Sequence, residues 1–171
     1  MKPETENKLR KIQKVSKVIR AICIIAFVLV AISFGATILV ILTSNGMFSV
    51  LEAPISLEGV ALPTRLLLAL MIFLSAAVIA KGLHHLNQLL GNYGRGDVFT
   101  TANAGHIRQL GITALLWYAV NMALGTTLVL SHLTHSVLFR SDSLVTGPLI
   151  IVISWFMEMA AEMREENELT I

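Results

Sequence analysis

Four long apolar segments restrict the folds open to this chain. They occupy residues 21–42, 66–90, 107–130 and 146–163. The first contains no charged residue, and away from their ends the others are interrupted only by Lys81 and Glu158. About 20 apolar residues in a helix cross the hydrocarbon core of a bilayer, where backbone groups must find partners within their own segment. The sequence therefore predicts four transmembrane helices.

The composition supports this prediction. Only 14% of the residues are charged and 55% are hydrophobic, whereas soluble domains carry about 25% charged residues. So few polar side chains would not cover a water-facing surface. A chain of 171 residues is expected to form one compact unit. We expect an all-α integral membrane protein with a four-helix transmembrane bundle at residues 21–163.

Lysine and arginine are unevenly distributed about the predicted spans. With four spans, eleven of the thirteen fall on the side of the termini: Lys2, Lys8, Arg10, Lys11, Lys14, Lys17, Arg20, Lys81, Arg95, Arg108 and Arg164. The other side keeps Arg65 and Arg140. Cytoplasmic loops carry the excess of positive charge in membrane proteins. The pattern therefore predicts cytoplasmic N- and C-termini in a bacterial inner membrane.

The segments outside the spans differ in character. Residues 1–20 are predicted to form a basic amphipathic cytoplasmic arm, either an anchor that fixes topology or a binder of lipid or acidic protein. Residues 164–171 form an acidic cytoplasmic tail. The outer segment 43–64 either lies on the membrane or caps the bundle.

Three polar residues within the predicted spans are candidate functional residues: Lys81, Asn121 and Glu158. Charged groups within a membrane are costly and usually face the bundle interior or water. Counting along the helices puts Lys81 and Glu158 at similar depths, so we hypothesise that they pair. Two interpretations remain open, namely an ion or proton path and interhelical pairing that fixes the register.

Other patterns do not predict a cofactor, metal or catalytic site. The five histidines lack the i, i+4 spacing of a helical zinc site. The glycine-rich residues 91–96 lack the Gly-Lys-Ser/Thr ending of a phosphate-binding loop, and a helix rather than a strand precedes them. We interpret them as a turn, followed by a helix that Thr100 or Thr101 caps. We expect neither enzymatic activity nor direct binding to nucleic acid.

Two sequence patterns carry a family resemblance. Gly96, Phe99, Asn103, Ile107 and Gly111 follow a regular spacing between the second and third spans, and the chain ends Glu-Asn-Glu-Leu-Thr-Ile. Together they resemble the bacterial membrane family catalogued as domain of unknown function 2975. The resemblance implies a small integral membrane protein of unassigned activity. Genes of that family often lie beside a small helix-turn-helix regulator, which implies a membrane partner for a transcription factor.

Two functions follow as hypotheses for a protein embedded in the lipid bilayer. The first is a non-enzymatic regulator that binds a cytoplasmic DNA-binding protein. Its family-motif and partner-contact candidates are Gly96, Phe99, Asn103, Glu162, Glu165, Glu166, Glu168, Leu169 and Thr170. The alternative is a small ion-coupled transporter or channel that uses Glu158 and Asn121. A homo-oligomer is compatible with either.

Overall fold

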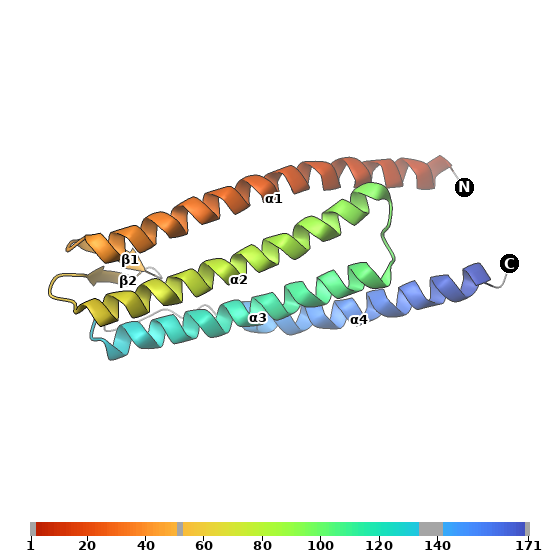
Figure 1. Ribbon diagram of the computed structural model, residues 1–171. Helices are drawn as coiled ribbons and strands as arrows, with labels where there is room; N and C mark the ends of the chain where they lie inside the picture. The colour runs from red at the N-terminus through yellow and green to blue at the C-terminus, as the bar shows by residue number, and fades with distance from the viewer. Residues whose placement is uncertain (1–2, 51–52, 134–141, 170–171) are drawn as a thin grey trace.

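A computed structural model describes residues 3–50, 53–133 and 142–169 of the chain (Figure 1). Its elements are α1 (Pro3–Thr43), β1 (Met47–Val50), β2 (Ala53–Ser56), α2 (Leu62–Arg95), α3 (Thr101–Leu130) and α4 (Asp142–Leu169). All four helices are long and apolar enough to cross a membrane. Each predicted span lies inside one of them, so the predicted all-α fold with four spans is confirmed.

The helices run up and down and pack in chain order (Figure 1). Contacts join α1 with α2, α2 with α3, and α3 with α4. Within the described ranges no contact joins α1 with α3 or α4, or α2 with α4. The bundle is therefore open, and much of the apolar surface of α1 is exposed. The described ends of α1 and α4 lie at the same end of the molecule, which we call the terminal end; the strands lie at the opposite end (Figure 1).

The basic arm is not separated from the first span. One helix of 41 residues, α1, runs from Pro3 to Thr43. At about 1.5 Å per residue this length exceeds the roughly 30 Å hydrocarbon core, so the arm extends beyond it as helix. The apolar side chains of Ile12, Val15 and Ile19 on the arm are exposed, whereas Ser16 is buried, so these apolar residues do not face the rest of the described chain.

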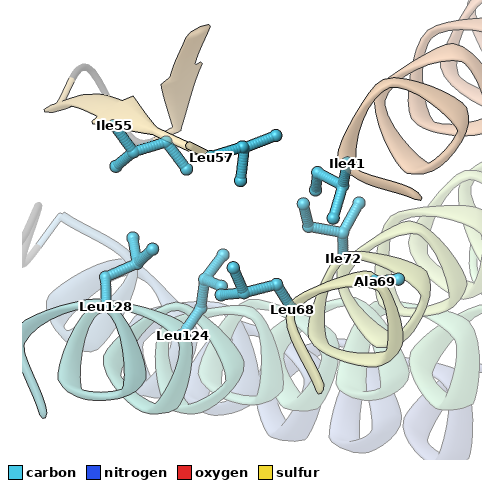
Figure 2. Close-up of a cluster of buried hydrophobic side chains, with 8 residues drawn as sticks. All are labelled: Ile41, Ile55, Leu57, Leu68, Ala69, Ile72, Leu124 and Leu128. Atoms are coloured by element: carbon cyan, nitrogen blue, oxygen red, sulfur yellow. The ribbon is translucent and has the colours of Figure 1, made fainter. Parts of the chain in front are cut away.

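The segment between α1 and α2 caps the end opposite the termini. Its strands β1 and β2 pair antiparallel, with Phe48 opposite Ile55. Ile55 and Leu57 are buried against side chains of three helices, as Figure 2 shows: Ile41, Leu68, Ala69, Ile72, Leu124 and Leu128. This cluster is the main apolar core of the described chain, so of the two alternatives for residues 43–64 the structure has the cap.

Arg65 fastens this cap to α2. Its guanidinium donates hydrogen bonds to the carbonyl oxygens of Ser44, Leu57 and Val60 at 2.9, 2.7 and 3.1 Å, and to Oδ1 of Asn45 at 2.6 Å. Of these acceptors, the carbonyl oxygen of Leu57 also accepts from the backbone N–H of Val60 at 3.3 Å. One of the two cations predicted on the outer side therefore has a structural role.

Helices α3 and α4 approach most closely at two glycines. A Cβ atom on Gly111 would lie 2.7 Å from the carbonyl oxygen of Gly147, so only glycine fits without a shift. The neighbouring Pro148 lies inside α4, which begins at Asp142. Because proline has no backbone N–H, Pro148 leaves the carbonyl of Leu144 without its usual helical donor.

Candidate functional site

The turn between α2 and α3 lies at the terminal end of the molecule (Figure 1). Helix α2 ends at Arg95 and is capped by Gly96, whose φ of 95° lies in the left-handed region that favours glycine. Helix α3 begins after Thr100, whose side chain accepts a hydrogen bond from the backbone N–H of Asn103 at 3.2 Å. The predicted threonine cap is therefore confirmed at Thr100. The prediction that residues 91–96 form the turn is wrong for residues 91–95, which continue α2, so the turn occupies residues 96–100.

Asn103 holds this turn together and is fully buried. Its Nδ2 donates to the carbonyl oxygens of Asp97 and Val98 at 2.5 and 3.0 Å, and its Oδ1 accepts from Nδ2 of Asn92 at 2.6 Å. Every polar atom of this amide is thus used inside the protein. Gly96 and Asn103 have structural roles here, whereas the side chain of Phe99 is 48% exposed and available to a partner.

Further polar contacts cross between helices near the terminal end. Arg20 of α1 donates from Nε to Oδ1 of Asn87 in α2 at 3.0 Å. Nδ1 of His85 in α2 and Nδ1 of His106 in α3 are 3.3 Å apart, a hydrogen bond in which one ring must supply the proton. The ring of His84 lies edge-on to that of His85. Three helices are therefore joined by polar side chains in this half of the molecule.

The three polar candidates within the spans are not brought together. Lys81 lies on α2 and Glu158 on α4, and these helices do not contact each other. The predicted Lys81–Glu158 pair is therefore wrong. Helix α3 packs against both α2 and α4, and the similar depth of two residues in the membrane does not show that their helices are neighbours. Asn121 donates to the carbonyl oxygen of Trp117 in its own helix at 2.7 Å. Glu158 is half-buried, and within the described chain it has no hydrogen-bond or ion-pair partner.

The acidic end of α4 lies at the same end of the molecule as the α2–α3 turn (Figure 1). Helices α3 and α4 are antiparallel and touch at Gly111 and Gly147. Ten residues along α4 from Gly147 is Met157, and ten residues back from Gly111 is Thr101, where α3 begins. At about 1.5 Å per residue, Glu162 therefore lies roughly 7 Å beyond the first residue of α3. Glu162, Glu165 and Glu166 are exposed there.

The remaining tail candidates are described only in part. Glu168 and Leu169 belong to α4, but their side chains lie outside the described residues, and Thr170 lies outside them altogether.

A comparison with protein-family models identifies the chain. Residues 48–171 match the model described as Protein of unknown function (DUF2975). The chain belongs to the DUF2975 family. The match begins in β1 and covers α2, α3 and α4, so the suspected family is confirmed. No curated protein and no solved structure matches this DUF2975 chain.

Two features of this DUF2975 protein bear on the chemistry of the terminal end. The histidine pair His85–His106 can share a proton, and exposed side chains such as Phe99 and Glu162 lie at this end. Over residues 3–50, 53–133 and 142–169, no group of three or more His, Cys, Asp or Glu side chains is placed to hold a metal ion.

Sequence reasoning missed the contacts Arg20–Asn87, His85–His106 and Asn92–Asn103 in this DUF2975 chain. The second and third pairs could have been found by counting outward in both directions from the α2–α3 turn, because residues that face each other on consecutive antiparallel helices lie at similar distances along the chain from the turn. No comparable sequence pattern indicated which of the four helices are neighbours in the bundle.

Proposed function

We propose that this DUF2975 protein is a non-enzymatic regulator in a bacterial inner membrane that binds a cytoplasmic helix-turn-helix transcription factor. One observation carries the proposal: α4 continues as helix to Leu169 with exposed acidic side chains, at the same end as the α2–α3 turn. With 28 residues, α4 is about 42 Å long and extends some 10 Å beyond the hydrocarbon core.

The charge of this surface suits such a partner. DNA-binding proteins carry basic surfaces that contact phosphates. The carboxylates of Glu162 and Glu165 present charge of the opposite sign, and complementary charge favours both encounter and specificity. Phe99, on the α2–α3 turn at the same end of the molecule, adds an exposed aromatic side chain of the kind that anchors interfaces. The acidic end of α4 would then compete with DNA for the basic surface of the partner.

The test is capture of a helix-turn-helix regulator, of the kind often encoded beside genes of this family, from membranes solubilised in mild detergent. We compare the full chain with a chain that ends at Arg164 and with a triple variant, Glu162→Gln, Glu165→Gln and Glu166→Gln. We expect the full chain to retain the regulator. The amount of regulator captured by each of the two altered chains should be at least tenfold lower. Glu58→Gln, an exposed carboxylate at the opposite end, is the matched control and should capture normally. Equal capture by all four chains would refute the acidic contact.

Glu158 favours a second candidate function, a small ion-coupled transporter or channel. It is a half-buried carboxylate in a span and lacks a hydrogen-bond or ion-pair partner in the described chain. The open arrangement of helices leaves room for a homo-oligomer that would enclose such a group. Under this alternative Glu158→Gln inserts and folds normally but abolishes ion flux in proteoliposomes, whereas Asn121→Ala reduces it. Flux at the wild-type rate in Glu158→Gln would eliminate this candidate.

A further inference from the structure

An apolar cavity of about 240 Å³ lies between α1 and α2 in the half of the molecule near the termini. Its walls include apolar residues of both helices and the single cysteine: Cys23, Ile24, Phe27, Val28 and Leu83. The polar side chains of His84 and Asn87 complete the lining. The cavity is half-open. Since both helices cross the membrane, it opens toward the hydrocarbon region.

A cation lies at the polar end of this cavity. Arg20 donates from Nε to Asn87, one of the lining residues, and its Nη1 lies near Gly91. Its other N–H groups have no acceptor, and it has no carboxylate partner, within the described part of the chain. The exposed Lys17 lies one turn earlier. Arg20 is also the last charged residue before the uncharged stretch 21–42, the position where lipid headgroups meet the hydrocarbon.

We propose that this cavity binds an anionic phospholipid, with an acyl chain between α1 and α2 and the phosphate on Arg20. A guanidinium is well suited to phosphate because its N–H groups form a planar fork. The volume is below the roughly 300 Å³ of most pockets for a whole ligand, so it suits one chain while the rest of the lipid stays in the bilayer. This site is independent of the proposed regulator function, because it lies on α1 and α2 rather than on the acidic end of α4.

The primary test is native mass spectrometry of the full-length protein in detergent, titrated with phosphatidylglycerol or phosphatidylcholine of the same acyl chains. We expect phosphatidylglycerol to bind about tenfold more tightly. Arg20→Gln should remove this preference and Arg20→Lys should retain part of it. Arg10→Gln removes an equal charge from the exposed arm and serves as the matched control, with binding unchanged.

Two further measurements locate the lipid. Ile24→Trp, which fills the cavity, should weaken binding of both lipids while circular dichroism shows unchanged helix content. Cys23 is the only cysteine, so its alkylation by a small maleimide reports on the cavity, and phosphatidylglycerol should slow it several-fold more than phosphatidylcholine. Glycerol phosphate, the soluble headgroup, should neither protect Cys23 nor displace the lipid.

Several outcomes would overturn the proposal. They are an unchanged lipid preference in Arg20→Gln, an equal loss in Arg10→Gln, undiminished binding in Ile24→Trp, or displacement of the lipid by glycerol phosphate alone. An equal loss in the two arginine variants would mean that only the summed charge of the arm attracts the lipid. Regulator capture uses different residues, so failure of one proposal is distinguishable from failure of the other.

Discussion

Gly111 and Gly147 bring α3 and α4 into backbone contact. The position of a Cβ on Gly111 lies 2.7 Å from the carbonyl oxygen of Gly147, and a Cβ on Gly147 would lie 2.7 Å from Cγ of Leu115. Small residues at such crossings let membrane helices pack closely, where van der Waals contact replaces the hydrophobic effect as the main attraction. This contact also sets the register by which the acidic end of α4 extends past the start of α3 at the terminal end.

Gly111→Ala is therefore expected to destabilise the fold by about 1–3 kcal/mol, because the added methyl group meets backbone atoms that cannot move independently. Gly105→Ala is the matched control on the same helix, since a Cβ there meets nothing within 4 Å. It should be neutral or stabilising by up to about 1 kcal/mol. Unfolding of the purified proteins in mixed micelles measures both, and an equal effect of the two substitutions would contradict the close approach.

Asn103→Ala should cost about 2–4 kcal/mol, because it leaves the carbonyl groups of Asp97 and Val98 and the amide of Asn92 without their partner. Asn121→Ala provides the comparison. Its amide makes one hydrogen bond within its own helix, so the loss should stay below about 1 kcal/mol. Hydrogen exchange should locate the damage of Asn103→Ala at residues 92–104. A mild effect there would mean that the turn does not depend on this side chain.

Arg65→Gln should loosen the cap at the opposite end while leaving the helices intact. Four acceptors lose a charged donor, and hydrogen bonds to charged groups contribute about 1.5–3 kcal/mol each when buried and less when exposed. Limited proteolysis should then cleave within residues 44–60 at least tenfold faster than in wild type. Glu58→Gln in the same segment should leave the rate unchanged. Unaltered resistance of Arg65→Gln would show that the apolar contacts suffice.

The histidine pair is testable by a double-mutant cycle. His85→Leu and His106→Leu each remove the same hydrogen bond between α2 and α3, so their effects on unfolding free energy should be non-additive by about 0.5–1.5 kcal/mol. His84→Leu combined with His106→Leu is the control. The structure records no hydrogen bond between His84 and His106, so these effects should add. Additivity in both cycles would argue against the bond.

The four spans could be predicted because lipid demands both apolar length and a self-satisfied backbone, and these are local properties of sequence. The α2–α3 turn was predictable for the same reason, since Gly96 and Thr100 act on their immediate neighbours. The cap could not be resolved in the same way. Burial of Ile55 and Leu57 depends on where α1, α2 and α3 end relative to one another, which the sequence of residues 43–64 does not contain.

The error over Lys81 and Glu158 has a specific cause. Counting along a helix gives depth in the membrane, whereas pairing also requires neighbouring helices. The structure has helices packed in chain order, so α2 and α4 are separated. Asn121 likewise donates its hydrogen bond to the carbonyl oxygen of Trp117, one turn earlier in α3, rather than to a group on another helix.

The proposed regulator function requires the termini to be cytoplasmic, and cysteine accessibility in intact cells tests that requirement. In a Cys23→Ser background, Met47→Cys introduces a thiol at an 82% exposed position in β1, and Glu165→Cys introduces one on the exposed end of α4. An impermeant maleimide should label the Met47→Cys variant in cells whose inner membrane is intact, and the Glu165→Cys variant only after that membrane is permeabilised. The reverse pattern would place the acidic end of α4 outside the cell, beyond reach of any cytoplasmic regulator.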